Sequence, residues 1–224
     1  MPLLSVVVPV YNEAKTIREI LEKISAVNID KEIIVVDDGS SDDTGKILRE
    51  IKYSNLKVIH HTSNRGKGAA FLTGLSHAQG EYVVIQDADL EYDPQDYPKL
   101  MEAIIKENAD FVLGARFLEG HTGLFMHRQG NKFLTRLFNF FFNTKFNDYS
   151  TCYKLFRRDA LSLLNLESNS FDIDVEILAK AIKKKLKPSE AMIAYYPRTY
   201  AQGKKIRWIH GVQAIMAIIK YSII

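Results

Sequence analysis

Short apolar runs that alternate with helix-like segments constrain the fold of this chain more than any other feature. The first half holds five such runs, rich in Val and Ile, and four of them lead into a helix-like stretch. Apolar strands separated by helices pair in parallel and are covered on both faces. We therefore expect an α/β fold with a mostly parallel sheet flanked by helices. The expected strands are residues 3–10, 32–36, 56–61, 81–86 and 110–114, and the expected helices are 13–27, 94–108 and two that open near residues 41 and 67.

Polar residues follow each of the first four strands directly. The carboxyl ends of parallel strands meet at one edge of a sheet, and in open α/β sheets ligands bind at that edge. Four polar clusters on one edge predict a binding site. They are Tyr11-Asn12-Glu13, Asp37-Asp38, Asn64-Arg65-Gly66-Lys67 and Asp87-Ala88-Asp89.

The fourth cluster carries the most specific chemistry. Asp87, Asp89 and Glu91 are spaced two residues apart after an apolar strand, so alternate side chains can point to one place. Converging carboxylates suit Mg²⁺ or Mn²⁺, and the usual cargo of a metal in such a short loop is a diphosphate. A plain solvated turn is the alternative interpretation of these acids.

Length and cysteine content bound the molecule further. With 224 residues, we expect a single domain, and one cysteine, Cys152, excludes an internal disulfide and fits a reducing compartment. The first residues resemble a strand rather than a signal peptide, and no stretch reaches the ~18 apolar residues of a membrane span. These features predict a cytoplasmic protein.

Charge is distributed unevenly along the chain. From residue 180 onward, ten Lys and Arg residues face one acid, whereas the first 179 residues carry twenty basic and twenty-six acidic residues. A basic tail after an acidic front indicates phosphate handling or a membrane surface. Nucleic acid is a poor fit, because most of the chain is acidic and it lacks a nucleic-acid-binding motif.

Two segments of the second half allow two interpretations each. Residues 132–146 form an aromatic stretch flanked by cations, and residues 206–224 contain one Trp, several Ile and few charges. Each predicts either a helix packed on the core or a helix lying in a membrane interface with its basic groups at the lipid headgroups.

The first three clusters can hold a nucleoside. Asp38 can accept from a base N–H, the backbone around Pro9 and Tyr11 can stack on a base, and Lys67 opens a helix whose positive end favours phosphate. A nicotinamide-linked oxidoreductase is a weaker alternative, since the loop at Gly66 and Gly68 lacks the third glycine of a dinucleotide fingerprint.

In their order, these motifs resemble the family 2 inverting glycosyltransferases of the GT-A fold. The residues concerned are Val8-Pro-Val-Tyr-Asn-Glu13, Val35-Val-Asp-Asp-Gly-Ser-Ser-Asp-Asp-Thr44, Asn64-Arg-Gly-Lys-Gly-Ala69 and Asp87-Ala-Asp-Leu-Glu91. Gly114-Ala-Arg116, residues 148–157 and Tyr196-Pro-Arg198 are similar to the polyprenyl-phosphate (dolichol-phosphate-type) mannosyl- and glucosyltransferases within that family. The resemblance covers about residues 3–210.

The resemblance implies a role for each motif. Residues 1–115 are the nucleotide-sugar-binding half of one GT-A domain, and residues 116–224 are the acceptor-binding half, a C-terminal helical region with interfacial helices. Asp89 and Glu91 hold Mg²⁺ or Mn²⁺, which neutralises the leaving diphosphate. The implied nucleotide-sugar contacts are Pro9, Tyr11, Glu13, Asp38, Lys67, Asp87, Ala88, Arg198, Lys204 and Lys205.

The acceptor decides whether a catalytic base is needed. A lipid phosphate is largely ionised near neutral pH and needs cations to hold it, for which Arg116 and Arg128 are the candidates. A sugar hydroxyl instead needs a carboxylate base. Cys152 has no adjacent base and is not expected to be a nucleophile. The candidate bases are Asp148, Asp172, Asp174 and Glu176.

We therefore expect a metal-dependent inverting transferase that moves a hexose from UDP-glucose or GDP-mannose to a polyprenyl phosphate. It would work peripherally on the cytoplasmic membrane face, alone or with a membrane-anchoring subunit. Transfer to a saccharide hydroxyl in surface-polysaccharide synthesis is the alternative, and a non-catalytic nucleotide-sugar-binding subunit is a third hypothesis.

Overall fold

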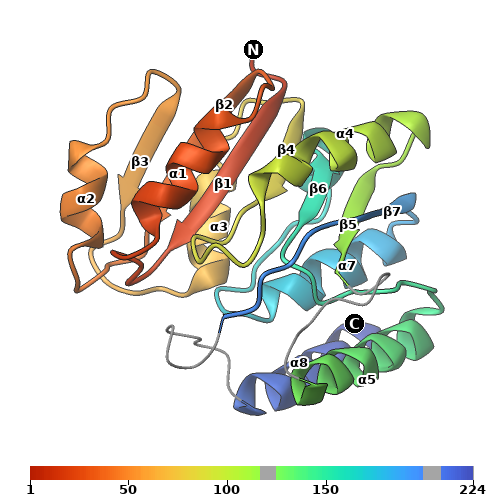
Figure 1. Ribbon diagram of the computed structural model, residues 1–224. Helices are drawn as coiled ribbons and strands as arrows, with labels where there is room; N and C mark the ends of the chain where they lie inside the picture. Colours follow the sequence, from red (N-terminus) through yellow and green to blue (C-terminus); the bar gives the residue numbers. More distant parts are fainter. Residues whose placement is uncertain (117–124, 199–207, 224) are drawn as a thin grey trace.

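One seven-stranded sheet with helices on both faces organises the chain. The computed structural model describes residues 1–116, 125–198 and 208–223, with the side chains of 125–128 and 208 left out. The strand order is β3-β2-β1-β4-β6-β5-β7. In Figure 1, α1 and α4 lie in front of the sheet and α3 and α7 behind it.

The parallel part of the sheet confirms the expectation from sequence. β1 pairs in parallel with β2 and with β4, β2 with β3, and β5 with β7. The five expected strands all form, within a residue or two of the expected ends. The parallel strands are β1 (Leu4–Val10), β2 (Lys31–Asp37), β3 (Leu56–His60), β4 (Tyr82–Ile85), β5 (Phe111–Ala115) and β7 (Pro188–Met192).

One strand runs against the others. β6 (Lys154–Arg157) lies between β4 and β5 and is antiparallel to both. Neither β6 nor β7 was expected from the sequence. β6 has only four residues and begins with Lys154, so it shows no apolar run long enough to stand out.

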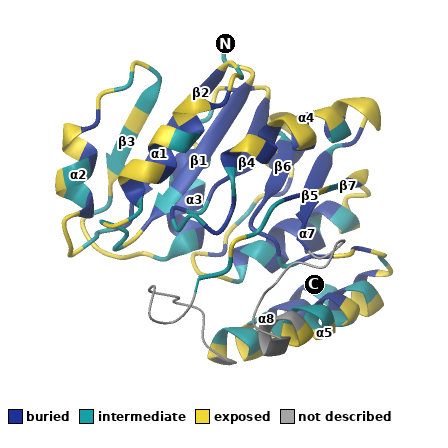
Figure 2. Cartoon of the chain, in the orientation of Figure 1, coloured by how far each residue is buried: buried dark blue, intermediate teal, exposed yellow. Residues whose placement is uncertain are grey.

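Helices cover the sheet and its ends. Their inward faces carry buried Ile and Leu, as in α1, where Ile17, Ile20, Leu21 and Ile24 are buried. Figure 2 shows the central strands β1, β2, β4 and β5 as the most buried part of the molecule, whereas the edge strands β3 and β7 are partly exposed. The helices are α1 (Ile17–Ala26), α2 (Thr44–Glu50), α3 (Lys67–Leu75), the 3₁₀ turn η1 (Pro94–Asp96), α4 (Tyr97–Lys106), α5 (Phe125–Phe142), α6 (Arg158–Ser162), α7 (Ile173–Lys183) and α8 (Trp208–Ile223).

The expected helix over 132–146 begins earlier and ends earlier than predicted. It is the C-terminal part of α5, which ends at Phe142 because Asn143 adopts a left-handed conformation with φ 50°. The Asn139 side chain then accepts hydrogen bonds from Thr144 and from the Phe146 amide, which turns the chain back.

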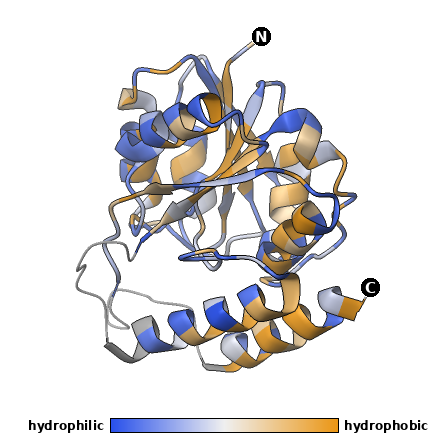
Figure 3. Cartoon of the chain, turned by 90° about the vertical axis from the view of Figure 1, so that its right-hand side faces the viewer, coloured by the Kyte–Doolittle hydropathy of each residue, from blue (hydrophilic) through white to orange (hydrophobic). Residues whose placement is uncertain are grey.

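The α5 helix packs against α8, and α8 packs against α7. Figure 3 shows α5 and α8 side by side below the sheet. Among the described residues, no helix has the length and apolar character needed to cross a bilayer. The core-helix interpretation of the aromatic segment is confirmed for one face, since Phe138 is fully buried, whereas Phe140 on another face is 81% exposed and the membrane-interface interpretation stays a prediction.

Candidate active site

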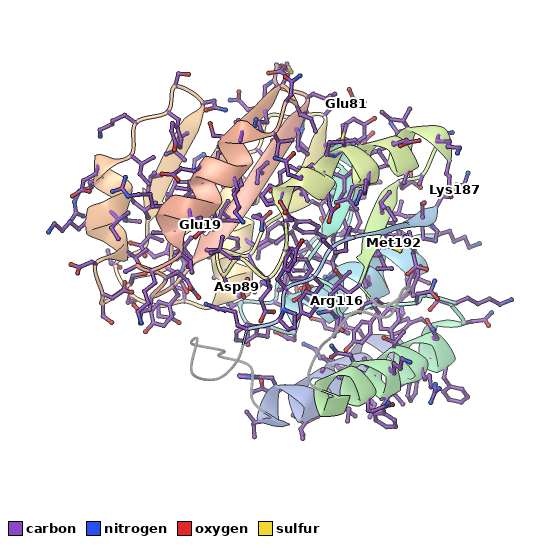
Figure 4. The ribbon with its side chains drawn as sticks, viewed as in Figure 1. Glu19, Glu81, Asp89, Arg116, Lys187 and Met192 are labelled. Carbon is purple, nitrogen blue, oxygen red and sulfur yellow. The ribbon has the colours of Figure 1, made fainter. Side chains whose placement is uncertain are left out.

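The carboxyl ends of β1, β2 and β4 bring the predicted clusters to one edge. β1 lies between β2 and β4. The strands that follow β1 are added first on one side of it, as β2 and β3, and then on its other side, as β4. A crevice for a ligand forms at such a switch point. In Figure 4, Asp89 and Arg116 lie at this edge, whereas Glu81 and Lys187 lie at the opposite end of the sheet.

Asp89 occupies the most charged part of this edge. Its Oδ1 accepts a hydrogen bond of 3.1 Å from the Glu91 amide, and Leu90 between them has φ 64°. Burial, together with the negative charges of Asp87 and Glu91, raises the pKa of Asp89 to about 7. A carboxylate destabilised in this way by its neighbours is expected where a cation binds.

The three acids of the motif face three different partners. Asp87 Oδ1 lies 2.9 Å from Lys67 Nζ, and Asp89 Oδ2 lies 3.2 Å from Arg198 Nη2. Glu91 is buried and binds the backbone and a tyrosine hydroxyl of the segment that carries Arg198. Within the described residues, no three His, Cys, Asp or Glu side chains are arranged to hold a metal ion together.

Glu91 anchors the segment that carries Arg198. Its Oε2 accepts from the Tyr195 hydroxyl at 2.8 Å, and its Oε1 accepts from the Arg198 amide at 2.8 Å. An isolated antiparallel bridge joins Tyr92 to Tyr195 at the same place. Both oxygens of Glu91 therefore hold the protein together, and the two oxygens of Asp89 likewise accept from the Glu91 amide and from Arg198. The assignment of Asp89 and Glu91 as metal ligands stays a prediction from sequence.

Arg198 bridges the first and fourth clusters. Its guanidinium lies 3.2 Å from both carboxylate oxygens of Glu13 and 3.2 Å from Asp89. Its Nε is buried and, within the described part of the chain, has no hydrogen-bond partner. The Arg198 guanidinium therefore lies beside Glu13 and Asp89, the carboxylates next to which sequence predicts the metal and the diphosphate. Lys204 and Lys205 lie outside the described residues.

Asp38 supports the loop that leads to Lys67. It is buried, and its oxygens accept from the Arg65 amide at 2.9 Å and the Gly66 amide at 2.8 Å, while His61 Nδ1 lies 2.6 Å away. Asp38 thereby fixes the turn that delivers Lys67 to Asp87. Around it, Pro9 is half-buried at the end of β1, Ala88 is buried, and Tyr11 is exposed.

The glycines of this loop serve close packing. A Cβ on Gly66, which has φ 99°, would stand 2.2 Å from the carbonyl oxygen of Asn169, and one on Gly68 would stand 2.1 Å from that of Ser168. The Ala69 amide donates to Asn169 O at 3.1 Å. The glycines are therefore required by the protein's own backbone, so they do not support a dinucleotide loop.

Arg116 follows β5 and is bound to a buried carboxylate. Its Nε lies 2.6 Å from Asp148 Oδ2, and its Nη2 donates to Asp148 Oδ1 at 2.9 Å. The guanidinium also lies 5.0 Å from the centre of the Tyr195 ring. The hydroxyl of Tyr195 donates to Glu91, so Tyr195 contacts both Arg116 and the acidic loop after β4. Arg128 lies in α5, and its side chain is outside the described residues.

The carboxylates proposed as bases are all engaged. Asp148 is paired with Arg116, and Asp172 accepts from Ser168 Oγ at 3.1 Å. Glu176 accepts from the Ser168 amide and pairs with Lys180. Asp174 lies 2.8 Å from Lys154 Nζ and 3.6 Å from Lys67 Nζ; burial opposes its ionisation, but the two lysines outweigh burial and lower the pKa of Asp174.

Sequence reasoning missed Lys154 and Tyr195. Lys154 is fully buried at the start of β6, and a lysine among Cys152, Tyr153, Leu155 and Phe156 was a signal that it needs a buried partner. Tyr195 had no such signal, because its role depends on Glu91 from a distant part of the chain.

The comparisons with known proteins identify the family. The model of glycosyl transferase family 2 matches residues 5–164. The chain belongs to this family. This glycosyltransferase is 31% identical over 204 residues to the low-salt glycan biosynthesis hexosyltransferase Agl6 of Haloferax volcanii, covering 88% of this chain and 48% of Agl6. It is also 38% identical over 120 residues to a dolichol-phosphate mannosyltransferase of Pyrococcus furiosus, covering 52% of this chain and 34% of that protein.

Solved structures confirm the GT-A fold of this glycosyltransferase. The glucosyl-3-phosphoglycerate synthase of Mycobacterium tuberculosis, solved with Mn²⁺, UDP and glucosyl-3-phosphoglycerate, superposes with a TM-score of 0.74 at 20% identity, covering 100% of this chain and 81% of that one. Residues 1–349 of TarS from S. aureus give a TM-score of 0.62 at 22% identity, covering 97% and 71%. This glycosyltransferase spans about half the length of Agl6.

Proposed function

We propose that this glycosyltransferase transfers a hexose from a nucleotide sugar, UDP-glucose or GDP-mannose, to a polyprenyl phosphate, with inversion and with Mg²⁺ or Mn²⁺. The observation that carries the proposal is the cluster of Glu13, Asp87, Asp89 and Arg198 at the switch point of the sheet, beside two helices with exposed apolar side chains. The ligand-bound relatives of this fold and the mannosyltransferase relative support it.

In this proposal, Asp89 holds the divalent cation, which stabilises negative charge on the leaving diphosphate. Arg198 moves from Glu13 and Asp89 to the diphosphate oxygens, with its buried Nε available for one of them. Asp87 accepts from the ribose hydroxyls, and Pro9, Tyr11, Ala88, Asp38 and Lys67 line the nucleoside site. The proposal also assigns Lys204 and Lys205, which lie outside the described residues, to the diphosphate.

The acceptor phosphate needs no base, because its second pKa of roughly 6 leaves it largely ionised at neutral pH. It needs cations, and we assign Arg116 and Arg128 to it. Arg116 would share its guanidinium between Asp148 and the phosphate. A hydroxyl acceptor, as in polysaccharide synthesis, is less well supported, because Asp148, Asp172, Asp174 and Glu176 are all held by hydrogen bonds or lysines.

The exposed faces of α5 and α8 fit the surface of a membrane. Both helices lack acidic residues, and Arg136, Lys145 and Lys220 are exposed on or next to them. An apolar face beside basic groups is the pattern of a helix that lies in an anionic lipid interface. We propose that the enzyme works peripherally on the cytoplasmic face of the membrane. The exposed apolar residues are Phe133, Phe140, Phe141, Ile209, Val212, Met216, Ile219 and Ile223.

The deciding experiment offers the protein Mn²⁺ or Mg²⁺, a panel of nucleotide sugars and a short-chain polyprenyl phosphate in detergent. Mass spectrometry should find a hexosyl phospholipid from one donor. A product formed only with water-soluble saccharides would favour the hydroxyl acceptor, and donor binding without any product would favour a non-catalytic subunit.

A further inference from the structure

A row of alternating charges connects α7 to the acidic motif after β4. Lys154 Nζ lies 2.8 Å from Asp174 Oδ1, Lys67 Nζ lies 3.6 Å from Asp174 Oδ2, and Lys67 Nζ lies 2.9 Å from Asp87 Oδ1. The four residues come from β6, α7, α3 and the loop after β4. Through its contact with Lys67, Asp174 thus connects the second half of the domain to the proposed nucleoside site.

Burial makes this arrangement sensitive to Asp174. The side chain of Lys154 is 0% exposed, and those of Lys67 and Asp174 are 16% and 22% exposed. A buried ammonium is tolerated only when it is paired, and Asp174 is the carboxylate that pairs with Lys154. Lys67 shares Asp174 with Lys154 and shares Asp87 with the ribose in the proposed function.

The same part of the chain also fixes the backbone around Lys67. Gly66 and Gly68 on either side of it contact the carbonyl groups of Asn169 and Ser168, five or six residues before Asp174. Residues 168–174 therefore contact both the main chain around Lys67 and its ammonium group, in addition to Asp38 and Asp87.

We propose that Asp174 is a positioning residue, which holds the Lys67 ammonium between two carboxylates and so leaves Asp87 available to the donor nucleoside. This inference rests on the proposed function. Lys67 already lies 2.9 Å from Asp87, and without the charge of Asp174 that pair would have no competing carboxylate among the described residues, so Asp87 would be less free to bind the ribose. Asp174 acts through Lys67 and does not touch the reacting atoms.

The test compares UDP and GDP affinity, measured by calorimetry with Mn²⁺, in the wild type, Asp174→Asn, Lys67→Met and the double variant. Loss of a group that orients a metal ligand typically costs roughly 10- to 100-fold in affinity or activity, and on that scale we expect nucleotide affinity to fall about 10-fold in Asp174→Asn. In the Lys67→Met background, Asp174→Asn should have no further effect, because the residue through which it acts is gone.

Glu32→Gln is the matched control. Glu32 also accepts several hydrogen bonds, from Ser5 and the amides of Gln79 and Gly80, but it lies at the opposite end of the strands. Its loss should lower stability and leave nucleotide affinity unchanged. If Asp174→Asn fails to fold, Asp174→Asn combined with Lys154→Met removes the unpaired buried lysine and gives the same readout.

A second measurement does not depend on nucleotide binding. Reductive methylation mapped by mass spectrometry should modify Lys67 faster in Asp174→Asn than in the wild type or Glu32→Gln. Unchanged labelling, equal nucleotide affinity, or additive losses in the double variant would each overturn the positioning role. A wild type that binds neither nucleotide while Lys67 labelling responds would instead reject the proposed function.

Discussion

Asp89 carries the most demanding role of any single residue in the proposed mechanism. We predict that Asp89→Asn lowers hexose transfer by more than roughly 100-fold while the melting temperature stays close to that of the wild type, because the change removes a metal ligand and an unfavourable charge together. Asp93→Asn is the control in the same loop, since the Asp93 carboxylate caps η1 by accepting from the Gln95 amide. Equal transfer rates in the two variants would reject the metal role of Asp89.

In the proposed function, Arg198 competes with the metal in the nucleotide-free protein. Its guanidinium lies 3.2 Å from Asp89 and from Glu13. We predict that Arg198→Ala binds Mn²⁺ about 5- to 10-fold more tightly without nucleotide, because a neighbouring positive charge is gone, and yet transfers hexose more slowly. Electron paramagnetic resonance of free Mn²⁺ measures this affinity directly. Weaker or unchanged Mn²⁺ binding would show that Arg198 does not occupy the metal's place.

At the scale of residues, sequence identified which side chains gather but not which atoms they face. The spacing of Asp87, Asp89 and Glu91 indicated one edge of the sheet, and the structure places them in one loop there. The partners of Asp89 and Glu91 could not be predicted from the sequence, because Arg198 and Tyr195 are more than a hundred residues away along the chain.

The α5 and α8 helices act as one element on the surface. We predict that Phe140→Glu lowers binding to anionic phospholipid vesicles several-fold in a flotation assay, since the side chain is 81% exposed and would enter the interface. Ile105→Glu is the matched control, because Ile105 is an exposed apolar residue on α4. Equal loss in both variants would mean that this helix pair is not the docking face.

The first turns of α7 are stabilised by an ionised carboxylate. Burial opposes ionisation of Glu176, but hydrogen bonds from Lys180, Ser168 and Glu167 outweigh it and lower its pKa. A lowered pKa means that its stabilising effect is complete above about pH 4.5 and is lost as the pH falls through the folded-state pKa. We predict that Glu176→Gln lowers the free energy of unfolding at pH 7 by about 1–3 kcal/mol. Chemical denaturation at pH 7 and pH 4 should show a smaller pH dependence in the variant than in the wild type, and parallel curves would contradict this assignment.

At the scale of elements, prediction succeeded where one pattern covers a whole element. Strands such as Ile33–Val36 are continuously apolar because both faces are buried, and that pattern is local. The end of α5 was misplaced because the aromatic run continues to Phe146, while the helix stops where Asn143 turns the chain.

The whole molecule depends on a strand order that no local pattern contains. The family resemblance supplied the GT-A fold, and the alternation of strands and helices supplied the parallel sheet. Insertion of β6 between β4 and β5 follows from pairings such as Val83 with Phe156, far apart in the sequence. Such pairings cannot be predicted from the sequence of either strand alone.

That insertion also governs the order in which the sheet is completed during synthesis. β4 can pair with β1 on one side once Tyr82–Ile85 has been made, but the strand that pairs with its other edge is complete only after Lys154–Arg157 has followed. In the interval, Val83 and Val84 present an apolar, unpaired edge of the kind that templates aggregation. Newly made chains are therefore most vulnerable between β4 and β6, and variants that weaken β6 should reduce soluble yield more than activity per folded molecule.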